Sequence, residues 1–195
     1  MAEPARRRGL DTAAVVEAAA RVADADGADA LTLAKVAAEL GVRTPSLYNH
    51  VAGLDDLRRR LALLALAELG AALGAAAVGL AGDDAVRALL RAQRAYATAH
   101  PGRYGFLARA PSERDSEGAA AAGAVVAVLT AGLRAYGLTG DEAVHTVRCL
   151  RSAVHGFVTL EAGGGFGLPL DLDHSFDVLV ELLVAGLAAG PGARA

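Results

Sequence analysis

Apolar residues recur at helical spacing along most of the chain, and glycines and prolines divide it into separate segments. A cap at Asp11 or Thr12 opens the first of these segments. No segment shows the alternating pattern of a strand, so we expect an all-α fold. Besides two short helices discussed next, we predict helices over about 12–25, 55–78, 83–100, 103–110, 118–136, 139–161 and 175–189.

Two short helices joined by a tight turn are predicted within residues 32–51. Thr32 is a good N-cap, because its hydroxyl can accept a bond from an N–H group of the first helical turn. Gly41 suits the left-handed turn that ends this helix. Thr44 is predicted to cap the second helix, with Pro45 at its first position, where the missing N–H costs nothing. This arrangement is typical of a helix-turn-helix.

The segment 41–51, Gly-Val-x-x-Pro-Ser-Leu-Tyr-x-His-Val, resembles the DNA-binding end of TetR-family (tetracycline-repressor-type) regulators, and the resemblance extends over roughly residues 10–60. Residues Leu150–Pro169 resemble, more weakly, the ligand-domain subgroup named for a Trp-His-Gly motif. The corresponding residues of this chain are Val154-His155-Gly156. The resemblance implies a three-helix DNA-binding domain over 1–53. A long connector helix would join it to an antiparallel helical ligand-binding and dimerisation domain over 54–195.

The second short helix is expected to dock in the major groove of double-stranded DNA. Leu47 and Val51 face back to the first helix, so the polar residues between them point outward. Arg43 is suited to bond guanine and Asn49 to bond adenine, each bidentately. The expected DNA-contacting set is Lys35, Arg43, Thr44, Pro45, Ser46, Tyr48, Asn49 and His50, of which Tyr48, His50 and Lys35 are assigned to phosphates. A basic arm, Arg6–Arg8, is either a further DNA contact or a solubilising tail.

The last two predicted helices carry apolar surfaces that suggest a second copy of the chain. The final helix is apolar over well over half its circumference, which is wider than the stripe of a surface helix. Two such helices from each subunit would form a four-helix interface, and a two-fold dimer would read a palindromic operator. The residues assigned to this interface are Val154, Phe157, Val158, Phe176, Leu179, Leu183 and Leu187.

A small hydrophobic effector is the expected ligand of the C-terminal part, because apolar pockets with a few polar groups suit such molecules. Candidate lining residues flank the Pro101-Gly102 break or share one arc of the helix over 139–161. They are Tyr96, His100, Tyr104, Phe106, His145, Arg148, Ser152 and His155. For the arc on the helix over 139–161, the alternative is an ordinary solvated or interface face. For the protein as a whole, the alternative is a DNA-binding dimer without any small-molecule ligand.

Composition narrows the functional classes. Hydrophobic residues make up 54% of the chain and aromatic residues 4%, which favours helices. The net charge is −3, and residues 1–60 hold nine basic and nine acidic side chains, so DNA contact must depend on local charge. The single cysteine, Cys149, fits a small buried residue in a reducing, cytoplasmic compartment. We expect no membrane span, and no catalytic, metal or cofactor site. The function predicted is that of a repressor released from its operator by an effector.

Overall fold

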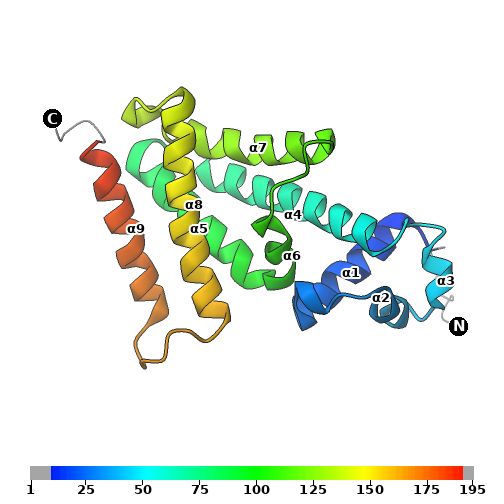
Figure 1. Cartoon of the computed structure of the whole chain (residues 1–195). Helices are drawn as coiled ribbons and strands as arrows, with labels where there is room; N and C mark the ends of the chain where they lie inside the picture. The colour runs from blue at the N-terminus through cyan, green and yellow to red at the C-terminus, as the bar shows by residue number, and fades with distance from the viewer. Residues whose placement is uncertain (1–9, 191–195) are drawn as a thin grey trace, which may run out of the picture.

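The computed structural model describes residues 10–190, and within that range the protein is helical without strands (Figure 1). The elements follow the predicted order. They are α1 (Thr12–Asp26), α2 (Leu33–Glu39), α3 (Thr44–Leu47), α4 (Leu54–Ala77), α5 (Gly82–Ala99), α6 (Pro101–Gly105), α7 (Ser116–Gly132), α8 (Gly140–Ala162) and α9 (Leu172–Ala188), with 3-10 turns at Ala28–Ala30, Phe106–Ala108 and Arg134–Tyr136. The all-α prediction is confirmed. We call α1–α3 the head and the helices from α5 onward the body.

The central helix α4 runs from the head into the body (Figure 1). Its first turns belong to the head, because Leu57 and Leu61 are fully buried in one apolar core with residues of α1, α2 and α3. From Ala65 onward the same helix contributes to a second core in the body. A continuous helix shared by two cores is a stiff connection, so a tilt of α4 in the body moves the head with it.

Helix α4 is long and apolar enough, by length and composition alone, to cross a membrane. In this structure it is instead the helix around which α1, α5, α6 and α7 pack. Its one charge in the apolar part, Glu68, lies in a polar network with α5 and α6 described below. These contacts identify α4 as the core helix of a globular fold.

Arg94 joins α5 to the two last helices. Its guanidinium donates two bonds to Glu161 of α8, at 2.6 and 3.0 Å, and lies 2.8 Å from an Asp173 oxygen of α9. It also lies over the rings of Phe157 and Phe176, 5.4 and 4.8 Å from their centroids. The Arg94 side chain is only 15% exposed, so its removal leaves the Glu161 carboxylate in a poorly hydrated place.

We expect Arg94→Ala to lower the free energy of unfolding by about 2–4 kcal/mol, because it leaves one partner of a largely buried ion pair uncompensated. Urea unfolding followed by circular dichroism at fixed protein concentration measures this change. Arg91→Ala is the matched control, since Arg91 pairs with Asp177 across the same two helices, α5 and α9, but is half exposed. Equal losses in the two variants would contradict the role given to Arg94.

Candidate nucleic-acid interface

The turn between α2 and α3 is built by the backbone around one glycine. Thr32 caps α2 as predicted, its hydroxyl accepting a bond from the Lys35 N–H at 3.2 Å. At the other end, Gly41 has a φ of +67°, which a side chain would disfavour. The N–H of Gly41 donates to the Ala38 carbonyl at 3.1 Å, and that of Val42 to the Ala37 carbonyl at 2.9 Å. This pair of bonds is a Schellman motif, which fixes the direction in which α3 leaves.

Helix α3 is a single turn held by its apolar side. Arg43 occupies the N-cap and makes no side-chain capping bond, so the predicted cap at Thr44 is wrong by one residue. Pro45 therefore stands at the second helical position and not, as predicted, at the first, although it is still within the first turn. Leu47 and Val51 are 0% and 3% exposed, so the expectation that both face the head core is confirmed. These two anchors leave the polar side of α3 directed outward.

The outward edge of α3 lies at the end of the molecule farthest from α9 (Figure 1). Tyr48 is 58% exposed, although a tyrosine ring is largely apolar. The His50 carbonyl accepts a bond from the Thr12 hydroxyl at 3.3 Å, which ties the end of this segment to α1. Of the remaining predicted DNA-contacting residues in this segment, Arg43, Pro45 and Asn49 are exposed and Thr44, Ser46 and His50 are half-buried.

Most charged side chains of α1 and α2 are engaged in ion pairs between these two helices. Lys35 donates to Asp26 of α1 at 2.7 Å, and Arg21 donates to Glu39 of α2 at 2.9 Å. These pairs brace α2 against α1, so a phosphate would have to compete with Asp26 for Lys35. Arg43 has no carboxylate within 4 Å among the residues that the structure describes. The Arg6–Arg8 arm lies outside the described residues.

A chain of polar contacts joins the head to the body. Arg103 of α6 donates to Asp24 of α1, at 2.7 Å from its Nε and 2.9 Å from its backbone N–H. Its Nη1 donates to Glu68 of α4 at 2.8 Å, and Glu68 also accepts a bond from the Tyr96 hydroxyl of α5 at 2.8 Å. We call Asp24, Arg103, Glu68 and Tyr96 the clamp. Burial, followed by the bond to Glu68, raises the pKa of Tyr96, so its hydroxyl remains a donor.

Sequence reasoning missed the clamp, although one signal for it was present. Glu68 is the only charge between residues 61 and 82, and a lone carboxylate in an apolar helix indicates a buried partner. The partner could not be identified, because Arg103 lies 35 positions along the chain.

The clamp depends on a close approach of α6 to α1. A Cβ placed on Gly102 would lie 1.9 Å from the Ala23 carbonyl oxygen and 2.5 Å from the Asp24 nitrogen. Only glycine fits there, since both obstacles are backbone atoms. The contact therefore fixes α6 against the end of α1.

A second polar contact holds the start of α4. Arg59 donates to both carboxylate oxygens of Asp115, at 2.6 and 2.9 Å, and to Glu117 at 2.7 Å. Asp115 is also the N-cap of α7, where it accepts a bond from the Gly118 N–H at 2.9 Å. The bond from Arg59 holds the pKa of Asp115 below its usual value. Helix α7 is thereby linked to the part of α4 that belongs to the head core.

The predicted effector residues separate into two groups. Inside the body, Gln93 donates to the Tyr104 hydroxyl at 3.0 Å, and His155 Nδ1 lies 3.4 Å from the same oxygen. Nearby, the Tyr96 and His100 rings are in contact, tilted by 57° with their centroids 5.1 Å apart. His145, Arg148 and Ser152 are exposed on α8, and Phe106 packs against the head core. The structure therefore corrects the expectation that His145, Arg148, Ser152 and His155 line one cavity.

The predicted dimer residues also need correction. Val154, Val158 and Phe176 are 0%, 5% and 2% exposed in the chain's own core, so they are not available to a partner. Phe157, Leu179, Leu183 and Leu187 are half-buried against the same core. The exposed apolar or small residues of α8 and α9 lie one position away from several of these. They include Cys149, Gly156, Leu160, Val178, Leu182, Ala185 and Gly186. Cys149 is exposed, so the expectation that it is a small buried residue is wrong.

Comparisons with known proteins agree with this architecture. The family model described as "Bacterial regulatory proteins, tetR family" matches residues 15–60, and the model described as "Tetracyclin repressor-like, C-terminal domain" matches residues 86–183. The chain is 39% identical over 184 residues to the uncharacterized HTH-type transcriptional regulator Rv0681 of Mycobacterium tuberculosis, covering 94% of this chain and 84% of the relative. It is 32% identical over 182 residues to the uncharacterized HTH-type transcriptional regulator YobS of Bacillus subtilis, with 93% and 94% covered. The Trp-His-Gly subgroup remains a prediction.

Solved structures share the fold. Streptomyces coelicolor ActR in complex with actinorhodin superposes with a TM-score of 0.69 at 24% identity, covering 96% of this chain and 99% of that one. The helix-turn-helix geometry, the two matched family models and the two full-length relatives lead to the same assignment. The chain belongs to the TetR family and is a DNA-binding transcriptional regulator.

Proposed function

We propose that the protein is a cytoplasmic repressor that binds a palindromic operator as a homodimer and is released from it by a small molecule. The observation that carries the DNA part is the outward edge of α3. Arg43, Tyr48 and Asn49 are exposed there. Leu47 and Val51 anchor the other side of the segment in the head core. A rigidly mounted polar edge fits the major groove.

Within this edge, Arg43 and Asn49 read bases and Tyr48 contacts the phosphate backbone. Arg43 is exposed and has no carboxylate partner within the described residues, so its guanidinium is free for the bidentate contact with guanine. Tyr48 and His50 lie farther along the segment and supply sequence-independent contacts. Thr44 and Ser46 are placed to support either kind of contact.

Two copies of the chain associate through the outer face of α8 and α9. Val178 and Leu182 are 46% and 66% exposed, although both belong to helix α9, whose opposite side is fully packed. Cys149 and Gly156 form a strip of small residues on α8 that lets a second helix approach closely. Members of the TetR family bind DNA as dimers, which supports this arrangement.

The effector acts through α6. This five-residue helix carries Arg103 in the clamp and the next residue, Tyr104, in the polar cluster with Gln93 and His155. A ligand that bonds to this cluster displaces Tyr104 and, with it, the residue that holds α1. Such couplings typically change DNA affinity by a factor of about 5–150. The ActR complex with actinorhodin, a structural neighbour, supports a ligand in this kind of body.

A mobility-shift assay tests the proposal, using DNA from the intergenic region upstream of the protein's own gene, at two salt concentrations and with competitor DNA. We expect a specific complex containing two chains, and weaker binding at higher salt because phosphate contacts release counterions. Absence of specific retardation at low salt on this DNA and on DNA selected from a random pool would overturn the proposal.

Residues that read bases and residues that contact phosphates are expected to affect DNA binding differently when they are substituted. Arg43→Ala should relax the preference at one base position, with a loss of about 1–3 kcal/mol of discrimination there. The double variant Tyr48→Phe/His50→Ala should weaken binding similarly on all sequences. Binding-site selection from a random pool measures both. An unchanged preference in Arg43→Ala would show that Arg43 does not read a base.

A ligand-independent regulator is the second candidate. Within the described residues, every buried side-chain polar atom has a hydrogen-bond partner, so Gln93 and Tyr104 satisfy each other without a ligand. Tyr104→Phe distinguishes the two candidates. If an effector acts through the Gln93–Tyr104–His155 cluster, Tyr104→Phe should abolish the effect of that molecule on operator affinity. In a ligand-independent regulator, the operator affinity of Tyr104→Phe should equal that of the wild type.

A further inference from the structure

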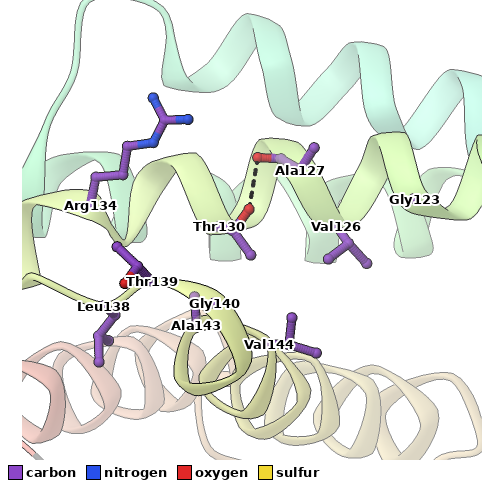
Figure 2. Close-up of a pocket in the computed structure, with 10 residues that line it drawn as sticks. All are labelled: Gly123, Val126, Ala127, Thr130, Arg134, Leu138, Thr139, Gly140, Ala143 and Val144. Atoms are coloured by element: carbon purple, nitrogen blue, oxygen red, sulfur yellow. Dashed lines mark hydrogen bonds between the residues drawn. The ribbon is translucent and has the colours of Figure 1, made fainter.

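A groove separates the C-terminal half of α7 from the start of α8 (Figure 2). Its volume is about 420 Å³, which lies within the range of small-molecule sites. None of the residues that line it belongs to the clamp or to the Gln93–Tyr104–His155 cluster. It is therefore a separate feature of the body, and the function proposed above does not use it.

The walls of the groove are apolar. Figure 2 shows Val126 from α7 and Val144 from α8 pointing toward one another across the gap. Ala143 lines the α8 side with a small, largely buried side chain. On α7, a Cβ added to Gly123 would have no atom within 4 Å, so the wall is recessed at that point. An apolar body can fill this space without displacing a side chain.

Two hydroxyl groups stand at the groove. Thr130 donates its proton to the Ala127 carbonyl at 3.1 Å, so its oxygen remains an acceptor (Figure 2). Thr139 is the N-cap of α8, yet its side chain makes no capping bond, so its hydroxyl is free to donate. Arg134 is the one charged residue along the groove among those described, and Figure 2 shows its guanidinium turned away from α8. No charge therefore faces the interior.

We propose that this groove binds a small uncharged molecule with an apolar ring body and a hydroxyl or carbonyl oxygen. The ring body lies between Val126 and Val144. A ligand hydroxyl donates to the Thr130 oxygen, whereas a ligand carbonyl accepts a bond from the Thr139 hydroxyl. An ionised ligand is disfavoured, because the apolar walls offer no charge to offset its loss of hydration.

Occupation of the groove has a route to the head through α7. Helix α7 packs along α4, where it buries Gly118 and Val125, so a movement of α7 is transmitted to α4. Its N-terminal Asp115 holds Arg59 of α4, about 22 Å from Thr130 at 1.5 Å rise per residue. A ligand that separates α7 from α8 moves Asp115 relative to the head. This regulatory consequence, unlike the binding itself, rests on the proposed function.

The binding is tested with 6-propionyl-2-(dimethylamino)naphthalene, an uncharged fluorescent ketone, titrated against the full chain. Gly123→Leu fills the recess and should weaken dye binding at least tenfold. Ala124→Leu adds the same side chain at an exposed neighbouring position that does not line the groove, and should leave binding unchanged. Equal affinities in the two variants would overturn the site. A change of oligomeric state in Gly123→Leu alone, measured by sedimentation velocity, would also overturn it, because the groove would then contact another chain.

The regulatory part is tested by adding saturating dye to the protein–DNA complex. We expect DNA affinity to fall at least fivefold in the wild type, and to respond less than twofold in Asp115→Asn, whose dye affinity is unchanged. A wild-type DNA affinity that does not respond to bound dye would overturn the coupling through α7. Absence of DNA binding without dye would instead contradict the proposed function, while the fluorescence titration would still decide whether the groove is a site.

Discussion

Gly102→Ala should lower the free energy of unfolding by about 3 kcal/mol, near the upper end of the cost of overpacking. The new methyl carbon would overlap the Ala23 carbonyl group, with 1.9 Å to its oxygen and 2.1 Å to its carbon. Neither atom can move without bending α1 or displacing α6. Differential scanning calorimetry should show a decrease in Tm of about 6–12 °C for a chain of this size.

Gly74→Ala is the matched control for this variant. Gly74 lies inside α4, and a Cβ there would meet no atom within 4 Å. Alanine in a helix interior is favoured over glycine by roughly 0.5–1 kcal/mol, so this control should be as stable as the wild type or more stable. If Gly102→Ala melted at the wild-type temperature, the close approach of α6 to α1 would be wrong, and with it the geometry of the clamp.

Gly102→Ala also separates folding from regulation. Its methyl group pushes α6 away from α1 and so lengthens the Arg103–Asp24 contacts. At temperatures where the variant is still folded, its DNA affinity should therefore no longer respond to an effector that acts through α6. A ligand in the groove between α7 and α8 acts through Arg59 and Asp115, so the DNA affinity of this variant should still respond to it.

The local elements of the fold were predictable because their signals lie within a few residues of one another. Thr32 caps α2, Gly41 ends it with a positive φ, and Pro45 stands in the first turn of α3. Each of these depends on backbone chemistry that neighbouring residues determine. The start of α9 was placed three residues late, because the capping role of Asp171 was overlooked; its side chain accepts a bond from the Asp173 N–H.

Which side of α8 and α9 faces a partner could not be predicted in the same way. Helix α9 is apolar around most of its circumference, and α8 has an apolar face beside a strip of small residues, so periodicity identifies no single buried side. Val154 and Phe176 pack into the chain's own core, whereas Leu182 and Gly156 remain outside. The decision depends on the position of α5, against which both helices pack, and a one-dimensional pattern does not contain that position.

The polar contacts between distant helices were likewise out of reach. Arg103 and Asp24 are 79 positions apart, and Arg59 and Asp115 are 56 apart. The first pair links α1 of the head to α6 of the body, and the second links α4 to α7. The residues that connect head and body could therefore not be predicted from the sequence. The DNA-contacting residues differ, since they follow from one short segment whose geometry is local.

Leu182→Glu should give monomers that bind the operator at least 100-fold more weakly than the dimer. Leu182 is 66% exposed on the outer face of α9, so the substitution leaves the chain's own core intact. In the proposed dimer, the new carboxylate would be buried in an apolar interface that offers it no positive partner. A monomer carries one α3 and loses the second, linked half-site contact, which is worth a factor of about 10²–10⁴.

Sedimentation velocity measures the oligomeric state of this variant, and a mobility-shift assay measures its affinity. Ala124→Glu introduces the same charge at an exposed position of α7 and should remain dimeric with wild-type affinity. The far-ultraviolet circular dichroism of both variants should match the wild type, which separates loss of association from loss of folding. If Leu182→Glu stayed dimeric, the interface would lie on another face. Because the distance between the two α3 helices depends on that interface, the expected spacing of the operator half-sites would then change as well.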